Sequence, residues 1–97
     1  MNLARLILQI LSDFDLEYVS RLKKDRDGEI DFNNRVIRIR YNLPAYRKNH
    51  VLLHEIAHVY YDLYTNTEAT EEEVDALAKA WISRIYSDLD YTKEEKQ

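Results

Sequence analysis

The three histidines of this 97-residue chain follow one another at intervals of four residues, as His50, His54 and His58. Residues four apart lie above one another on one face of an α-helix, so the three imidazoles would share a face. His54 and His58 frame an HExxH motif, in which Glu55 follows the first histidine. Two imidazoles at this spacing can bind one Zn²⁺, and the carboxylate between them can reach a water on that ion. The same pair can also arise by accident on an exposed helix, so a third ligand decides the interpretation.

Candidates for a third ligand lie at the start of the last segment in which apolar residues recur at helical spacing. Glu71, Glu72 and Glu73 come just before the residues expected to face the core. At about 100° per residue, Glu71 points closest to that side. Asp75 follows one turn later, where its carboxylate could accept the second N–H of a ligand histidine. Acids in a first helical turn also complement the helix dipole, but that alternative does not explain Asp75 stacked behind the inward glutamate.

The elements that position these residues follow from hydrophobic periodicity. Apolar residues at helical spacing predict a first helix over about residues 2–14, and alternation with β-branched residues favours a strand within 16–22. The only glycine, Gly28, ends a polar turn in which we expect it to have a positive φ. A β-hairpin follows over residues 29–41, with Asn33-Asn34 at its turn.

The segment that carries the histidines is expected to form a middle helix. Asn42 is the expected cap, Pro44 falls in the first turn, and the helix should run to about Tyr64. Its apolar residues cluster on one side and should pack against the core. On the other side, His50 and Tyr61 flank the two histidines of the motif.

A last helix completes the expected fold. Thr70 and Glu73 have the spacing of a capping box, which opens a helix to about Leu89. The polar residues 89–97 are expected to form a mobile tail. The sequence thus predicts one minimal zincin-like α+β domain over residues 1–97. Its order is an N-terminal helix, a small three-stranded sheet with a hairpin, the histidine helix and the glutamate helix.

Composition limits the class of protein. Hydrophobic residues make up 45% and charged residues 33%, as in a globular chain rather than a disordered one. Because cysteine is absent, a metal must be bound by histidine and carboxylate. A net charge of −4 gives no reason to expect a nucleic-acid partner, and no segment predicts a membrane span. Arg5 and Gln9 interrupt the first apolar stretch, which argues against a secretory signal, so we expect a cytoplasmic protein.

The HExxH motif followed by Glu-x-x-x-Asp resembles the gluzincin zinc metallopeptidases. Residues 71–75 with Ala78 are similar to the Glu-x-x-Ala-Asp helix of the ImmA/IrrE-type proteases, which also occurs in the catalytic domains of the CAAX prenyl and heat-shock membrane proteases. Val74 stands where those families usually have alanine. Chain length and element order resemble the soluble archaeal minigluzincins. The resemblance covers about residues 28–82.

This resemblance implies a role for each matching residue. His54, His58 and Glu71 would bind one catalytic Zn²⁺, with a water in the fourth position. Glu55 would act as general base and then as proton carrier. Asp75 would orient His54 through a hydrogen bond. The implied activity is hydrolysis of peptide bonds in a peptide or protein substrate.

The residues that would contact a substrate are less sharply defined by the sequence. The expected rim of the cleft is the second hairpin arm, where an extended peptide could add backbone hydrogen bonds. Its residues are Val36, Ile37, Arg38, Ile39 and Arg40. Candidates for the oxyanion or the cleft are His50, Tyr61 and Tyr64. His50 is alternatively a surface residue or an N–H partner to a neighbour, and the tyrosines are alternatively surface and core residues.

Three functions are compatible with this pattern. The first is an active zinc peptidase. The second is a latent peptidase or catalytically silent zinc scaffold, in which acids of the terminal segment occupy the open metal position, in the same molecule or through self-association. Those acids are Asp88, Asp90, Glu94 and Glu95. The third, a regulatory protease of the ImmA/IrrE type acting on a repressor, rests on the resemblance alone.

Overall fold

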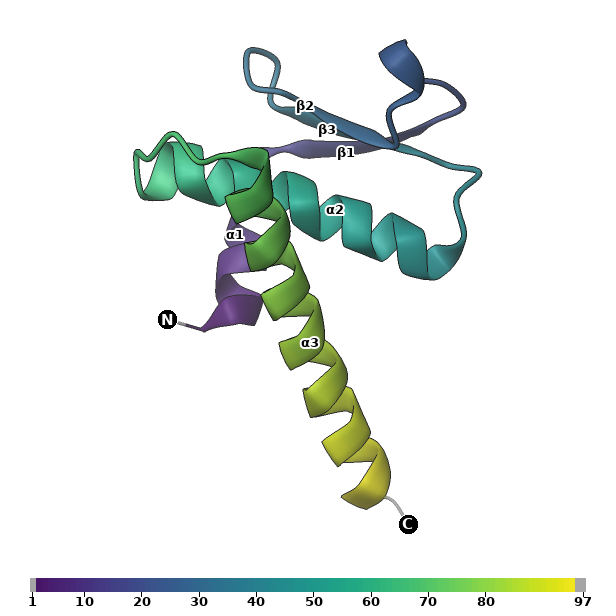
Figure 1. Cartoon of the computed structure of the whole chain (residues 1–97), viewed down its shortest axis with the longest axis vertical. Helices are drawn as coiled ribbons and strands as arrows, with labels where there is room; N and C mark the ends of the chain where they lie inside the picture. The colour runs from purple at the N-terminus through teal and green to yellow at the C-terminus, as the bar shows by residue number, and fades with distance from the viewer. Residues whose placement is uncertain (1, 96–97) are drawn as a thin grey trace.

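The computed structural model describes residues 2–95, with side chains described as far as residue 85. Within these residues the fold is α+β, as predicted, with helices packed on a small mixed sheet (Figure 1). The regular elements are α1 (Leu3–Asp13), β1 (Asp15–Val19), β2 (Gly28–Asp31), β3 (Val36–Arg40), α2 (Ala45–Val59) and α3 (Glu71–Glu95). A 3₁₀ turn (Lys23–Asp25) precedes β2, and a π-helical turn (Tyr60–Tyr64) extends α2.

The sheet has the strand order β1-β3-β2, with β1 parallel and β2 antiparallel to β3. Ile37 and Ile39 of the central strand are fully buried in the core beneath the sheet. On the other face Arg38 pairs with Glu17 of β1 at 3.2 Å and with Glu29 of β2 at 2.9 Å. Because one face is apolar and the other charged, helices cover the sheet on one side (Figure 1).

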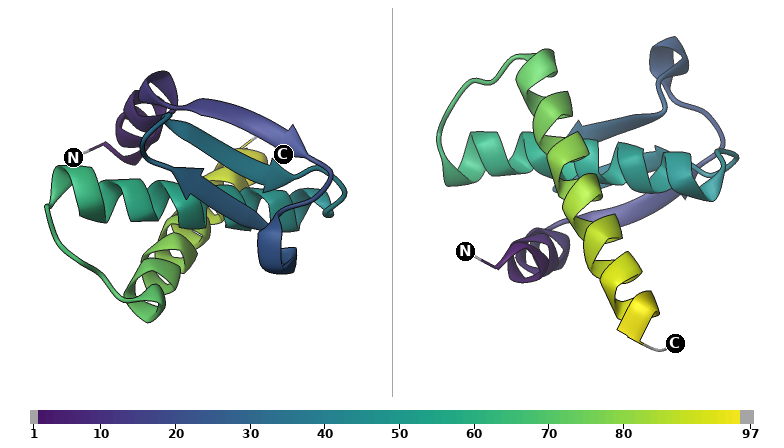
Figure 2. Two further views of the ribbon diagram at one scale, coloured as in Figure 1. Left: turned by 90° about the horizontal axis from the view of Figure 1, so that it is seen from above. Right: turned by 60° about the horizontal axis from the view of Figure 1, so that its bottom comes forward.

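The helices form two layers beneath the sheet. α2 lies along the apolar face, and α3 crosses α2 on the side away from the sheet (Figure 2). α1 packs beside them and contributes Leu6 and Ile10 to the core. The largest fully buried side chains are Ile10, Ile37, Ile39, Ile56, Val59 and Val74. Burial of each contributes about 1.5–3 kcal/mol, so this core fixes α2 firmly against both layers.

Gly28 does not have the positive φ that we expected. The left-handed residues of this connection are Lys24, with φ of 57°, and Asp25, with φ of 53°. A Cβ added to Gly28 would instead collide with Cγ1 of Val51 on α2. Glycine is therefore needed here because the start of β2 approaches α2 closely, and not because of its backbone angles.

The hairpin turn also differs in detail from the prediction. Asn33 and Asn34 lie at the turn, as expected, and both tolerate left-handed geometry, but the left-handed residue is Arg35, with φ of 55°. Asp31 accepts hydrogen bonds from the backbone N–H of Asn34 at 3.1 Å and from its side-chain amide at 2.8 Å. These bonds hold the turn after β2 and place the reversal one residue later, at Arg35.

The start of α2 differs from the prediction and its end agrees with it. Pro44 is the N-cap, and its carbonyl oxygen accepts from the backbone N–H groups of Arg47 and Lys48. Asn42 lies two residues too early to cap a helix that begins at Ala45. The π-helical turn then carries the helical backbone to Tyr64, where we expected the helix to end.

The start of α3 matches the predicted capping box, and its end does not match. Thr70 Oγ1 accepts from the Glu73 backbone N–H at 3.1 Å, while Glu73 Oε1 accepts from the Thr70 backbone N–H at 3.2 Å. The helix continues past Leu89 to Glu95, since this segment contains good helix formers and no glycine or proline. The expected mobile tail over 89–97 is thus helical up to Glu95, and residues 96–97 lie outside the described chain. None of the described helices combines the length and apolarity that crossing a membrane requires.

Candidate metal centre

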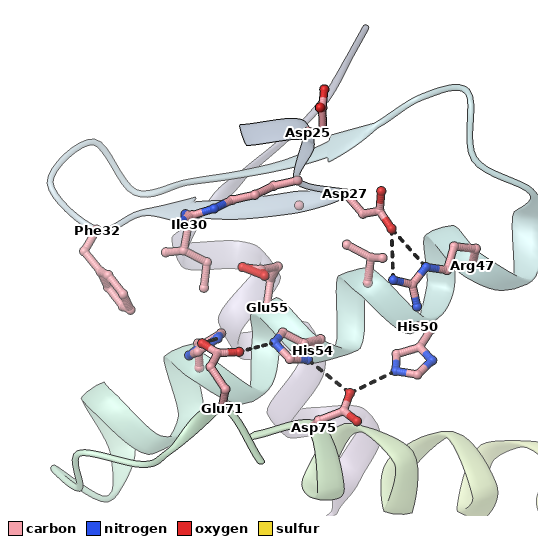
Figure 3. A pocket seen from close by; sticks show the side chains of 14 residues that line it. Asp25, Asp27, Ile30, Phe32, Arg47, His50, His54, Glu55, Glu71 and Asp75 are labelled. Atoms are coloured by element: carbon pink, nitrogen blue, oxygen red, sulfur yellow. Dashed lines mark hydrogen bonds and ion pairs between the residues drawn. The ribbon is translucent and has the colours of Figure 1, made fainter. Parts of the chain in front are cut away.

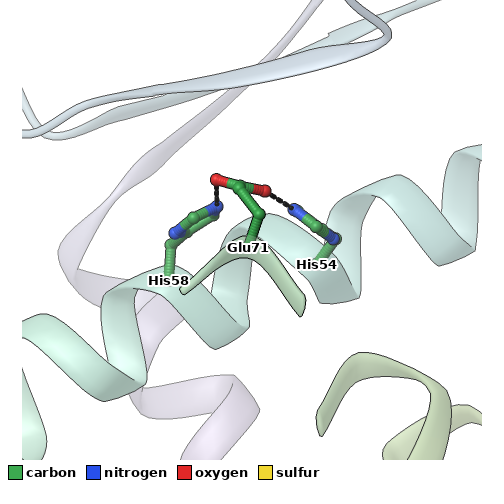
Figure 4. Close-up of side chains that lie close together, drawn as sticks. All are labelled: His54, His58 and Glu71. Atoms are coloured by element: carbon green, nitrogen blue, oxygen red, sulfur yellow. Dashed lines mark hydrogen bonds and ion pairs between the residues drawn. The ribbon is translucent and has the colours of Figure 1, made fainter. Parts of the chain in front are cut away.

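The two histidines of the HExxH motif converge with Glu71 at the crossing of α2 and α3 (Figure 4). Ile56 and Val59 anchor the opposite side of α2 in the core, with 0% and 1% of their surfaces exposed. His54 Nε2 lies 3.1 Å from Glu71 Oε2, and His58 Nε2 lies 3.1 Å from Glu71 Oε1. One donor atom from each residue falls within 4.8 Å of the others. These three side chains are therefore positioned to hold a metal ion.

The chemistry of this donor set fits a small divalent ion with nitrogen and oxygen ligands. In a tetrahedral zinc site with bonds of about 2.0–2.1 Å, ligand atoms lie roughly 3.3 Å apart, which is close to the separations found here. Burial lowers the pKa of His58, and the neighbouring Glu71 opposes this decrease. A lowered pKa favours the neutral imidazole that a metal needs. Glu71 is 75% exposed at its side chain, so the site opens to solvent on this side.

Glu55 lies beside this group but in a very different environment. It is the only buried charged residue among residues 2–85, with 8% of its surface exposed. Burial raises its pKa to about 7; His54 opposes that rise and Glu71 adds to it. Such a carboxyl can exchange a proton near neutral pH, which an exposed glutamate cannot do as readily.

Asp75 lies behind His54, on the side away from Glu71. Its Oδ1 is 3.4 Å from His54 Nδ1 and 3.3 Å from His50 Nε2. Its Oδ2 is 3.0 Å from Lys79 Nζ. The pKa of Asp75 falls to about 2, first because Lys79 donates to it and next because His50 does. The carboxylate is thus ionised at neutral pH and can accept from His54.

These residues line a cleft of about 680 Å³ between β2 and α2 (Figure 3). Its roof consists of alternate residues of β2 and the following turn, namely Gly28, Ile30 and Phe32. Its floor consists of the α2 residues His50, Val51, His54, Glu55 and His58. Glu71 and Asp75 of α3 form the side wall. The β2 strand, the buried Glu55 and the group His54, His58 and Glu71 thus line one open groove.

The comparisons with known proteins identify the family. The model of the Peptidase M78 family, described as the IrrE N-terminal-like domain, matches residues 4–82. The chain belongs to this ImmA/IrrE-type zinc metallopeptidase family. No curated protein and no solved structure matches it.

The rim strand of this IrrE-type domain is β2, so the expectation for Val36–Arg40 is wrong. β3 lies in the middle of the sheet, where β1 and β2 pair with both of its edges. An extended peptide therefore cannot add to it. Periodicity identified the hairpin arms, but it did not show that β1 pairs with the second arm and not the first.

The two tyrosines proposed for the oxyanion do not line the cleft. Tyr64 stacks on Tyr60 with ring centroids 6.2 Å apart, and Tyr61 packs edge-on against Tyr60 at 5.8 Å. The physical reason is the π-helical turn, which changes the angular spacing after Val59, so that a regular α-helical projection fails there. His50 does line the cleft, with its Nε2 directed at Asp75 (Figure 3).

Sequence reasoning missed the residues that close one end of the cleft. Asp27 accepts from Arg47 Nε at 3.1 Å and Nη2 at 2.9 Å, and it also accepts from Arg40 Nη1 at 3.3 Å. This contact ties the loop before β2 to the start of α2 (Figure 3). No local pattern indicated these contacts, because Asp27 lies 13 residues before Arg40 and 20 residues before Arg47. The roof residues did carry a signal in the sequence. Gly28, Ile30 and Phe32 are spaced two residues apart, which places them on one face of a strand.

Proposed function

We propose that this single domain is a zinc-dependent peptidase that hydrolyses peptide bonds by attack of an activated water. The observation that carries the proposal is the convergence of His54, His58 and Glu71 within 4.8 Å, beside the buried Glu55 in the same cleft. Membership of a peptidase family supports a protein or peptide as the substrate.

Each residue of the centre has a defined part in this reaction. His54, His58 and Glu71 would hold the ion and leave a fourth position open for water and substrate. A bound zinc ion would supply Lewis-acid chemistry, which lowers the pKa of a water to about 7 and would polarise the scissile carbonyl. Glu55 accepts the proton as the water oxygen bonds to the carbonyl carbon, and it then donates that proton to the leaving amine as the C–N bond breaks.

The edge of β2 is the proposed binding site for the substrate backbone. β2 pairs with β3 on one side and stands at the edge of the sheet on the other. An extended peptide could add to this edge and lie between the roof and the floor of the cleft. The side chains of Ile30 and Phe32 would then contact apolar residues of the peptide.

Zinc content and peptidase activity of matched variants test the proposal. Glu55→Gln should keep zinc and lose activity by at least about 100-fold, as expected when a general base is removed. Glu71→Gln should weaken zinc binding, whereas Glu72→Gln, the same change one residue away, should leave zinc and activity unchanged. A wild-type protein that takes up no zinc under metal-replete conditions would rule out the proposal.

Latency through the chain's own terminus is a separate proposal that the fold constrains. The acids considered for it lie on α3 at or beyond residue 88, and their side chains lie outside the described residues. At about 1.5 Å per residue, Glu94 lies roughly 35 Å along the helix from Glu71. α3 runs away from α2 and the sheet (Figure 1), so occlusion would need a second molecule or an unwound α3.

Truncation separates an active peptidase from a latent or silent one. We expect a chain ending at Leu89 to gain activity if terminal acids occupy the metal in a neighbouring molecule. Equal activity of the full and shortened chains at all protein concentrations would exclude inhibition by Asp90, Glu94 and Glu95, the acids that this truncation removes. A zinc-loaded chain that is inactive in both forms would favour the silent scaffold, or a regulatory protease of ImmA/IrrE type with a narrow choice of substrate.

A further inference from the structure

His50, His54 and His58 form a histidine stripe along one face of α2. The proposed reaction gives no role to His50. It lies one turn before His54 on α2, and its side chain is 26% exposed. Its Nε2 is 3.3 Å from Asp75 Oδ1, the same oxygen that lies 3.4 Å from His54 Nδ1 (Figure 3). One carboxylate oxygen of α3 therefore meets two imidazoles of α2.

The two other partners of Asp75 differ in how well they can fix its position. Lys79 reaches Oδ2 at 3.0 Å, but its side chain is 66% exposed and has four rotatable bonds. Exposed pairs of this kind contribute little, because ordering a long side chain offsets their attraction. His50 has only two side-chain torsions and projects from a helix whose opposite side is buried. It is the partner better able to hold the carboxylate.

We propose that His50 is a positioning residue for the metal centre. Its Nε2–H donates to Asp75 and holds Oδ1 where it accepts the Nδ1–H of His54. That bond fixes the tautomer of His54 and directs its Nε2 lone pair toward Glu71 and the ion. The role explains why all three histidines lie in one stripe: two bind the ion and the third orients the acid behind them. It rests on the proposed zinc site.

Zinc affinity, measured by competition with a chromophoric chelator, is the readout. Asp75→Ala should weaken zinc binding about 10- to 100-fold, the usual effect of losing a partner of a ligand histidine. His50→Ala should weaken it about 3- to 10-fold, because Asp75 stays but is less well held. Lys79→Ala, which removes the exposed partner, should change it by less than about 2-fold.

Two amide variants test whether zinc affinity depends on an N–H donor at the position of His50 Nε2. The amide of glutamine can replace the Nε2–H of histidine, whereas asparagine is too short to reach Asp75. His50→Gln should therefore restore affinity to within about 2-fold of wild type, and His50→Asn should resemble His50→Ala. Thermal unfolding of the metal-free variants identifies any that fail to fold, and the folded amide variants then carry the test.

A double-mutant cycle decides whether His50 acts through Asp75. In an Asp75→Ala background, His50→Ala should have no further effect on zinc affinity. Wild-type affinity in His50→Ala, or an equal loss with and without Asp75, would overturn the proposal. If the wild type itself does not bind zinc, the proposed function fails as well, so the two failures can be told apart.

Discussion

At the scale of single residues, the centre contains two glutamates whose environments suit different tasks. Glu55 is buried beneath Gly28, and burial raises its pKa to about 7. The side chain of Glu71 is 75% exposed, although both of its oxygens face imidazoles. A buried carboxyl with a raised pKa suits proton transfer, while an exposed carboxylate that faces two imidazoles suits binding of a cation. The different environments of the two glutamates thus support different proposed roles, general base for Glu55 and metal ligand for Glu71.

Glu55 should make the metal-free protein less stable as pH rises. Its carboxyl ionises near 4.5 when unfolded and near 7 when folded, so the folded state binds the extra proton between these values. Its contribution to the free energy of unfolding is therefore full below 4.5 and is lost as pH rises through 7. Urea unfolding in the presence of a chelator measures this effect. From pH 5 to pH 8, the free energy of unfolding of the wild type should fall by on the order of 3 kcal/mol relative to that of Glu55→Gln. Parallel pH profiles for the two proteins would show that Glu55 is not perturbed.

At the scale of elements, the cap of α3 positions Glu71, the proposed third metal ligand. Thr70 and Glu73 satisfy each other's backbone N–H groups, and Glu71 is the first residue of the helix that they open. A frayed first turn would move the Glu71 carboxylate away from both imidazoles. We therefore expect helix stability and the proposed metal binding to depend on the same hydrogen bonds.

Thr70→Ala should consequently reduce both the free energy of unfolding and zinc affinity. The loss of an N-cap costs about 0.5–2 kcal/mol, and zinc affinity should fall several-fold with it. Thr67→Ala is the matched control, because the Thr67 hydroxyl donates to Thr65 in the exposed loop and caps no helix. It should change stability by less than about 0.5 kcal/mol. Chemical denaturation and zinc titration of both variants measure the difference, and equal effects would contradict the role of the cap.

Close packing of β2 on α2 gives a second prediction for these elements. Gly28→Ala should destabilise the fold by about 1–3 kcal/mol, because the new Cβ meets Val51 Cγ1. Val51→Ala removes that methyl group, so the double variant should be less destabilised than the sum of the two single changes. Urea unfolding of the four proteins measures the coupling. Strict additivity would show that the strand shifts without touching Val51.

Local patterns predicted the elements that carry the site, and long-range pairing decided the rest. The HExxH helix and the capping box at Thr70 depend on residues three or four apart, so their geometry follows from the sequence. The strand order depends on β1 pairing with β3 across 21 residues, as in Leu16 with Ile37, and no local rule selects it. Tyr60, the first residue of the π-helical turn, likewise packs edge-on against Trp81 of α3, a long-range contact that no local pattern shows. That is why the convergence of His54, His58 and Glu71 was predictable, whereas the rim strand and the positions of Tyr61 and Tyr64 were not.

At the scale of the whole molecule, the centre joins parts that are distant in the chain. Two of the proposed ligands come from α2 and the third from α3, and the cleft roof comes from β2. The connection from α2 to α3 between residues 65 and 70 is exposed except for Ala69, so little burial holds it in place. An ion bound by all three ligands would link the two crossing helices directly. Binding that occurs only in the folded state must stabilise that state.

Zinc should therefore raise the unfolding temperature of the whole domain. At a free concentration of about 100 times the dissociation constant, the gain is about 2.7 kcal/mol, which corresponds to about 10–20 °C for a domain of this size. Differential scanning calorimetry with and without a chelator measures the shift. His58→Ala should abolish the zinc-dependent shift while leaving the metal-free protein folded, because its side chain is 28% exposed and lies outside the core. A shift of equal size in His58→Ala would show that zinc acts elsewhere on the chain.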